Sequence, residues 1–261
     1  MNVICWSGGK DSTATIILAH IHNIPIDRIV FAEVMFSHKD NISGENPEHI
    51  KWIKEVAIPK LNDWGYVVDV VKSKEDYLSY FWLKHQGRGK HPERKGNFYG
   101  WFMPQGCWGN SHLKVEPMDK YFRQFKEYTK IVGIAIDEPK RLERAYSKNQ
   151  RSLLAEYGMT EENAKALCKE YGLLSPIYAN GISRSGCWFC PNSTIKEMAK
   201  IKGGHPELWD EIKKLAEYFQ HHVDQFAYGY KINFLRGKAF SEVERKVDEF
   251  LAEQASKISL F

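Results

Sequence analysis

The sequence has few cysteines, no long apolar run and little net charge, and each shortage excludes a class of protein. Five cysteines in 261 residues predict thiols or metal ligands rather than a disulfide framework. The apolar runs are far shorter than the roughly 20 residues of a membrane span, so we expect no membrane partner. A net charge of +4 permits anionic partners without requiring nucleic acid.

The sequence also lacks internal repeats and low-complexity linkers, and we expect no secretion leader. It begins with strand-like residues 2–6, not with the basic and long apolar stretches of a signal peptide. We therefore expect a cytoplasmic protein. The length suits one large α/β domain, with or without a helical appendage.

The order of the apolar segments predicts the fold class. Strand-like and helix-like segments alternate through the first half, which implies parallel pairing. We predict an α/β fold with an open parallel sheet, helices on both faces and a helical C-terminal region. The predicted domains are residues 1–158 and 159–261. The predicted strands are 3–6, 28–35, 66–71 and 130–136, and the predicted helices are 12–22, one opening at Pro47, 161–171, 193–202, 206–226 and 241–256.

A glycine-rich turn separates the first strand from the first helix, with the sequence Ser7-Gly8-Gly9-Lys10-Asp11-Ser12. Backbone N–H groups and the positive end of the helix dipole meet at such a turn, and together they suit a phosphate group. Gly8 and Gly9 would let the backbone approach the phosphate oxygens, and Lys10 would add a positive charge.

The remaining side chains of this turn divide into hydrogen-bond donors and a carboxylate. Ser7 and Ser12 could donate hydroxyl hydrogen bonds, whereas Asp11 would repel phosphate. We therefore assign Asp11 to capping the helix or holding Mg²⁺. The sequence lacks GxxxxGK[ST] and GxGxxG phosphate-binding patterns, and an ordinary tight turn is the alternative.

This turn resembles the SGGxDS loop of the PP-loop ATP pyrophosphatases. In that superfamily the loop grips pyrophosphate or an equivalent anion while the α-phosphorus of an adenine nucleotide is attacked. Two further segments resemble the phosphoadenosine phosphosulfate (PAPS) reductase family, namely residues 133–141 and Cys107 with residues 113–117. The resemblance covers residues 1–195 and implies an adenine nucleotide alpha hydrolase-like fold that binds ATP.

Charged residues in these segments are further site candidates. Asp137 and Glu138 follow a predicted strand, at the sheet edge where α/β proteins bind ligands, and could hold Mg²⁺ or orient a nucleophile. Lys114, Lys140 and Arg141 would neutralise phosphate charge. Solvated surface charges are the alternative. The predicted catalytic set is Lys10, Asp11, Asp137, Glu138 and Arg141.

The cysteines suggest a metal site. Cys187 and Cys190 have the CxxC spacing with which two thiolates can face one metal ion, and Cys107 and Cys168 are candidates to complete a set of four. Four thiolates would suit Zn²⁺ or an iron–sulfur cluster such as [4Fe–4S]. A redox pair at the CxxC and a core role for Cys168 are the alternatives. Several reductases of the resembled family carry a cluster on paired cysteines, but here Trp108 follows Cys107.

A basic segment with aromatic neighbours could close over an anionic acceptor, either a small molecule or a nucleic acid. A solvated loop is the alternative. Its charged residues are Lys84, His85, Arg88, Lys90, His91, Arg94 and Lys95.

The sequence is compatible with three functions. The first is an enzyme that cleaves ATP between the α and β phosphates and adenylates an acceptor, with sulfur transfer from a donor protein as one route. The second is a reductase of PAPS or adenosine phosphosulfate that releases sulfite. Reductases of this kind use a cysteine on a C-terminal tail, and no cysteine follows Cys190 here, so we expect the first. The third is a non-catalytic nucleotide-binding protein with a structural zinc.

Overall fold

The chain divides into two compact units. The computed structural model describes residues 1–88, 91–102, 107–179, 182, 185–229, 234–235 and 237–258. Unit 1 comprises Met1–Val34, Glu45–Lys74 and His112–Gly186, and unit 2 comprises Met35–Gly44, Glu75–Ser111 and Cys187–Phe261. The boundary predicted at residue 158 falls inside unit 1, because each unit is assembled from three separate segments.

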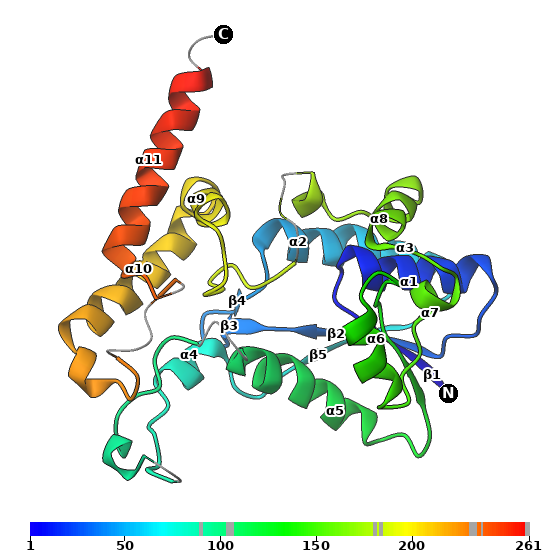
Figure 1. The fold of residues 1–261 in the computed structure, drawn as a ribbon, viewed down its shortest axis with the longest axis horizontal. Helices are drawn as coiled ribbons and strands as arrows, with labels where there is room; N and C mark the ends of the chain where they lie inside the picture. Colours follow the sequence, from blue (N-terminus) through cyan, green and yellow to red (C-terminus); the bar gives the residue numbers. More distant parts are fainter. Residues whose placement is uncertain are drawn as a thin grey trace. The chain divides into compact units, whose positions relative to one another are not determined.

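Unit 1 contains a parallel sheet of four strands, as the alternation of segments predicts. The order across the sheet is β5-β2-β1-β6, and every neighbouring pair is parallel. Figure 1 shows the strands running side by side beneath α1. Their bounds are Asn2–Trp6 for β1, Arg28–Glu33 for β2, Val68–Lys72 for β5 and Thr129–Ile131 for β6.

Helices cover both faces of this sheet. Ile4 and Phe31 pack on one face in the larger core cluster, whereas Val3 and Val30 pack on the other face against Phe122. Because both faces are buried, the strands are apolar throughout rather than alternating. The first face carries α1 (Lys10–Ile21), α3 (Ile58–Asp63), α7 (Leu153–Glu156) and α8 (Glu161–Glu170), and the second carries α5 (Glu116–Phe122).

Two helices of unit 1 contain a widened turn just before a proline. The helix that opens with α2 (Pro47–Trp52) passes through a π-turn at Ile53–Ala57 before Pro59. A second π-turn, Asn110–Val115, runs into α5 before Pro117. Proline has no N–H and its ring clashes with the carbonyl four residues earlier, and a wider turn relieves both problems.

Strand β6 ends at Ile131, so the strand predicted over residues 130–136 is too long. After β6 the Val132 N–H donates to the carbonyl of Arg151 at 2.9 Å. Gly133 then passes against the first turn of α1, where a Cβ atom on Gly133 would lie 2.4 Å from the Ser12 nitrogen. The segment leaves the sheet to make this backbone contact.

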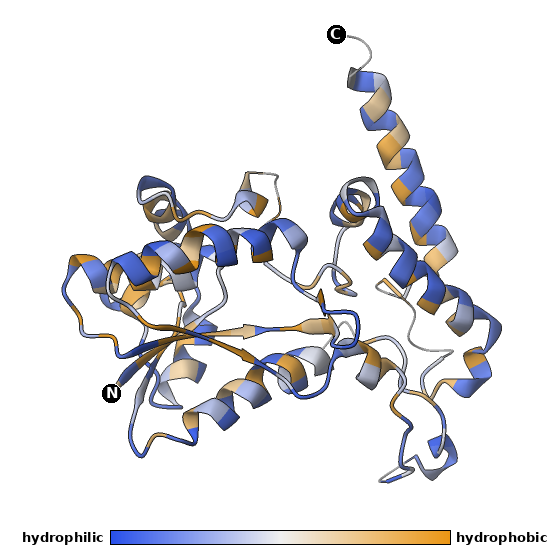
Figure 2. Cartoon of the chain, turned by 180° about the vertical axis from the view of Figure 1, so that it is seen from behind, coloured by the Kyte–Doolittle hydropathy of each residue, from blue (hydrophilic) through white to orange (hydrophobic). Residues whose placement is uncertain are grey.

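Unit 2 combines a small hairpin with helices and a core rich in aromatic rings. Strands β3 (Met35–Ser37) and β4 (Ile42–Ser43) pair antiparallel. Phe36 of this hairpin packs on Tyr77, Trp188 and Phe189. Figure 2 shows that the long helices of this unit carry both apolar and hydrophilic residues. The helices are α4 (Tyr77–Phe81), α9 (Ile195–Gly204), α10 (Pro206–His221) and α11 (Phe240–Ile258).

The helices predicted in the C-terminal half are confirmed, with α10 ending earlier than predicted, at His221. Within the described residues, no helix combines the length and the apolar character that crossing a membrane requires.

We expect Gly133→Ala to lower the free energy of unfolding by about 1–3 kcal/mol, because the new methyl group would overlap backbone atoms of α1 that cannot move aside. Gly186→Ala is the matched control, since a Cβ atom there meets no described atom within 4 Å. Urea unfolding of both variants measures the difference. Equal transition midpoints for the two variants would contradict this account of the contact.

Candidate functional site

The glycine loop, residues 7–9, lies at the point where the strand order of unit 1 reverses. Strand β2 pairs on one side of β1 and β6 on the other. The loops after β1 and β6 therefore flank a topological switch point, where open α/β sheets bind ligands. The approach of Gly133 to Ser12 shows that the loop after β6 contacts the first turn of α1, directly after the glycine loop.

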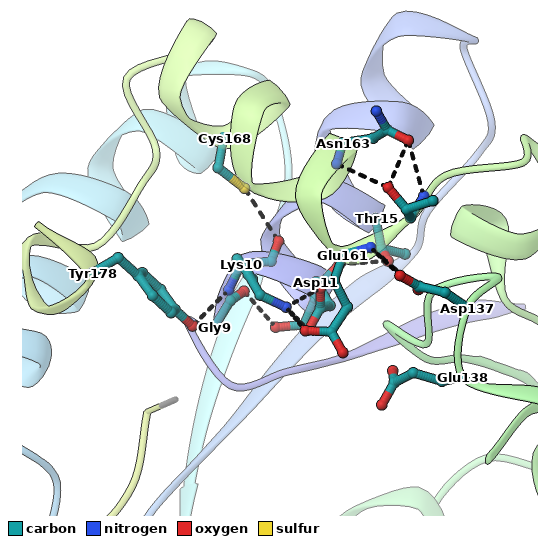
Figure 3. Close-up of polar contacts among 12 residues, drawn as sticks. Gly9, Lys10, Asp11, Thr15, Asp137, Glu138, Glu161, Asn163, Cys168 and Tyr178 are labelled. Atoms are coloured by element: carbon teal, nitrogen blue, oxygen red, sulfur yellow. Dashed lines mark hydrogen bonds and ion pairs between the residues drawn. The ribbon is translucent and has the colours of Figure 1, made fainter. Parts of the chain in front are cut away.

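Hydroxyl groups accept hydrogen bonds from three N–H groups in and next to the loop. The Ser7 N–H donates to Ser12 Oγ at 3.2 Å, and the Gly9 N–H donates to Ser7 Oγ at 3.3 Å. The Lys10 N–H donates to the Tyr178 hydroxyl at 3.0 Å, as Figure 3 shows. Within the described residues, no hydrogen bond uses the Gly8 N–H.

Hydroxyl groups surround the position where Gly9 has no side chain. A Cβ atom on Gly9 would lie 3.1 Å from Ser7 Oγ, and 3.3 Å from both Ser185 Oγ and the Tyr178 oxygen. The backbone of Gly9 has φ −71° and ψ 157°, which any residue can adopt. Glycine is therefore required here for space rather than for conformation. Hydroxyl and N–H donors gathered close to a glycine backbone suit the oxygens of an anion.

Lys10 is engaged by two carboxylates. Its Nζ lies 2.8 Å from Asp11 Oδ1 and 2.6 Å from Glu161 Oε2 (Figure 3). Burial disfavours the charged form of Lys10, but the hydrogen bonds to Asp11 and Glu161 outweigh it and raise the pKa of Lys10. The sequence predicts Lys10 as a phosphate ligand, and the structure shows that its charge is already compensated.

Carboxylates gather beside Lys10. Burial raises the pKa of Asp11 despite the neighbouring lysine, and the charges of Glu161 and Glu138 act in the same direction. Glu138 Oε2 is buried without a hydrogen-bond partner in the described part of the chain. Among those residues, however, no three His, Cys, Asp or Glu side chains form a group that could hold a metal ion. A magnesium site at Asp11, Asp137 or Glu138 stays a prediction.

The segment after β6 supplies other predicted residues. Asp137 accepts a hydrogen bond from the Glu161 N–H at 3.2 Å, so it binds the first turn of α8. Arg141, in α6 (Pro139–Tyr146), pairs with Glu138 of the same turn. Lys140 is exposed on the same helix. The Arg141 contact is thus local to the loop and α6, whereas the Asp137 contact joins the loop to α8.

Lys114 is the last predicted phosphate ligand. It lies in the π-turn before α5, and its Nζ is 2.9 Å from Glu45 Oε1. Glu45 is buried and also accepts a hydrogen bond from the Val34 N–H at 3.4 Å. Like Lys10 and Arg141, Lys114 faces a carboxylate of its own unit.

Sequence reasoning missed three residues that contact the glycine loop and its helix. Tyr178, Glu161 and His49 come from distant parts of the chain, and no local pattern marks them.

The five cysteines separate into two groups, and none forms a disulfide. Cys5 and Cys168 belong to unit 1, and burial raises the pKa of each thiol to about 12. Cys168 lies in the core, where its thiol donates to the Lys10 carbonyl at 3.1 Å. The other three cysteines, Cys107, Cys187 and Cys190, belong to unit 2.

A tight turn forms the CxxC segment of unit 2. The Cys190 N–H donates to the Cys187 carbonyl at 3.0 Å. The pKa of the buried Tyr77 hydroxyl is raised, mainly by burial and also by Cys187 and Cys107, so these thiols lie near it. The described residues contain no three-ligand metal group, and the four-cysteine site stays a prediction.

The basic segment is ordered by its own backbone hydrogen bonds. The His85 N–H donates to the Asn97 carbonyl at 2.8 Å, and the Gly96 N–H donates to the His85 carbonyl at 2.9 Å. The Arg94 guanidinium stacks over Tyr228 at 4.5 Å. Lys90 lies outside the described residues. Binding of an anionic acceptor here stays a prediction.

Comparison with known proteins identifies distant relatives. Two uncharacterized proteins of Methanocaldococcus jannaschii are similar to the chain. One is 26% identical over 233 residues, which cover 84% of this chain and 42% of the relative. The other is 24% identical over 238 residues, which cover 86% of this chain and 50% of the relative. The chain thus spans about half the length of these relatives. No protein-family model matches it.

We expect the thiols of Cys5 and Cys168 to resist alkylation in the folded protein. With a pKa of about 12, each is ionised to about one part in ten thousand at pH 8, and the thiolate is the reactive form. Iodoacetamide labelling followed by peptide mass spectrometry, with and without urea, measures each site. Equal labelling rates in the two conditions would contradict the prediction.

Proposed function

We propose that the chain binds ATP at the glycine loop and cleaves it at the α-phosphate, so that an acceptor becomes adenylated. The observation that carries the proposal is the position of the loop, at the N-terminus of α1 and at the switch point of a parallel sheet. The hydroxyl groups around Gly9 and the Gly8 N–H would supply donors for phosphate oxygens. The resemblance to the PP-loop superfamily supports the same conclusion and the finer fold assignment.

The proposed reaction needs an anion-binding loop above all. A nucleophilic atom of the acceptor would attack the α-phosphorus, the bond to the bridging oxygen would break, and pyrophosphate would leave while the acceptor loses a proton. N–H groups fixed toward the leaving pyrophosphate would stabilise the charge that develops on it. Magnesium would supply further charge neutralisation, and Asp11 and Glu138 are the carboxylates proposed to hold it.

The thiol chemistry of unit 1 favours ATP cleavage over reduction of a sulfonucleotide. Reductive release of sulfite requires a thiolate that attacks sulfur. The two thiols in the same unit as the glycine loop, Cys5 and Cys168, are both kept protonated by burial. We propose the tight turn at Cys187 and Cys190 as a site for Zn²⁺ or an iron–sulfur cluster, because the CxxC spacing in such a turn is typical of paired thiolate ligands.

We expect the protein to release pyrophosphate from ATP and to release no sulfite from PAPS in the presence of thioredoxin. Coupled pyrophosphate and sulfite assays should include small anionic acceptors, RNA and a persulfide sulfur donor. Thioredoxin-dependent sulfite release would replace the proposal with a reductase. Tight ATP binding with no product from any acceptor would favour a non-catalytic nucleotide-binding protein.

We expect Gly9→Val to bind ATP at least about tenfold more weakly. The backbone angles of Gly9 permit valine, while its side chain would fill the space among Ser7, Ser185 and Tyr178. Calorimetric titration with ATP measures the loss, and thermal unfolding checks the fold. Unchanged affinity in a folded Gly9→Val protein would move the nucleotide site away from this loop.

A further inference from the structure

A buried histidine lies directly behind the glycine loop. His49 of α2 is fully buried. Its Nε2 lies 3.0 Å from the Ser7 carbonyl oxygen, and its Nδ1 lies 2.8 Å from Ser175 Oγ. A carbonyl oxygen can only accept, so Nε2 carries the hydrogen and donates it. In the neutral ring Nδ1 then accepts from the Ser175 hydroxyl.

The surroundings of the ring favour this neutral form. Burial lowers the pKa of His49 and outweighs the hydrogen bond to Ser7. Two charged groups act on the ring. Glu45 favours protonation of His49, and Lys114 opposes it. These two are paired with each other at 2.9 Å, so their effects on the ring partly cancel. The ring is neutral at pH 7.

The bond to Ser7 fixes the direction of the next N–H group. In a trans peptide the C=O and N–H groups lie in one plane and point in opposite directions. Holding the Ser7 carbonyl on His49 therefore turns the Gly8 N–H toward the side of the loop away from α2. Within the described residues, no hydrogen bond uses that N–H.

The same ring also supports Gly8 by contact. Gly8 has φ +71°, and a Cβ atom there would lie 2.8 Å from His49 Cε1 and Nε2, and 2.7 Å from Ile53 Cδ1. The imidazole and the Ile53 side chain thus form the floor on which the Ser7–Gly8 peptide rests. A hydrogen bond and a packing contact from one side chain define the orientation of this peptide.

We propose that His49 is a positioning residue of the glycine loop, whose ring holds the Ser7–Gly8 peptide so that the Gly8 N–H donates to a phosphate oxygen. The inference rests on the proposed function, because the phosphate belongs to the bound nucleotide. His49 itself does not touch the ligand. Its effect passes through the peptide, and Ser175 stabilises the tautomer that the arrangement requires.

The test compares three variants for binding of ATP and of inorganic pyrophosphate by calorimetry. His49→Leu removes the donor, and we expect about tenfold weaker binding of both ligands. His49→Gln keeps an N–H donor of similar reach, and we expect it to recover most of the affinity. Ile53→Val trims the floor under Gly8 without removing a donor, so it should lower the melting temperature with little change in affinity.

The outcomes separate the inference from the proposed function. If the unmodified protein binds neither ATP nor pyrophosphate, the proposed function fails. If it binds them, Gly9→Val does not, and His49→Leu binds as tightly as the unmodified protein, then only the role of His49 fails. Equal losses in His49→Leu, His49→Gln and Ile53→Val would indicate a purely structural role and also overturn the inference.

A measurement on the unmodified protein covers the case in which His49→Leu does not fold. Nitrogen NMR shifts of the His49 ring should show a hydrogen on Nε2 at pH 7, and pyrophosphate should shift the Gly8 amide proton downfield. A hydrogen on Nδ1, or a Gly8 amide that saturating pyrophosphate leaves unmoved, would overturn the proposal.

Discussion

The first turn of α1 carries backbone N–H groups that the helix cannot bond itself, and the loops of unit 1 are arranged around this constraint. The first bond within the helix runs from the Thr13 N–H to the Gly9 carbonyl. Earlier in this turn, the Lys10 N–H donates to the Tyr178 hydroxyl. The backbone of Gly133 packs directly on the backbone of Ser12, with no side chain between them. The early end of β6 follows from that packing.

The charges around the loop show which groups are available to an anion. Each of the side-chain cations Lys10, Lys114 and Arg141 pairs with a carboxylate of unit 1. Removing one partner of a buried ion pair leaves the other charge uncompensated, which is costly. At Gly8, by contrast, the backbone N–H has no competing partner among the described residues. A phosphate that displaced Lys10 from Asp11 would also leave a carboxylate in need of a cation, which supports the proposal of magnesium there.

Local patterns in the sequence predicted the parts of this fold that depend on neighbouring residues. The strand before the glycine loop, the helix after it and the parallel pairing follow from apolar periodicity and the order of elements, and all are confirmed. The two units were not predictable from the sequence. The chain passes from unit 1 to unit 2 at Met35 and back at Glu45, and the amino-acid composition does not change at either point.

In the candidate site, too, features formed by neighbouring residues were predictable, whereas contacts between distant residues were not. The glycine loop is visible in the sequence, whereas its contacts with His49 and Tyr178 join residues 42 and 168 positions apart. Periodicity within a segment carries no information about such contacts. The partners of the cations were hidden for the same reason, since Glu161 and Glu45 are distant in sequence from Lys10 and Lys114.

A site that relies on peptide N–H groups depends on the residues behind it. A lysine side chain can rotate to follow its ligand, but a peptide group turns only when the backbone on both sides turns with it. The orientation of the loop must therefore be fixed before the ligand arrives, and such preorganisation is what makes backbone donors effective. Gly133, His49 and Tyr178 fix it from three separate segments. In the proposed anion site, specificity would thus depend on the core of unit 1 as much as on the glycine-rich sequence itself.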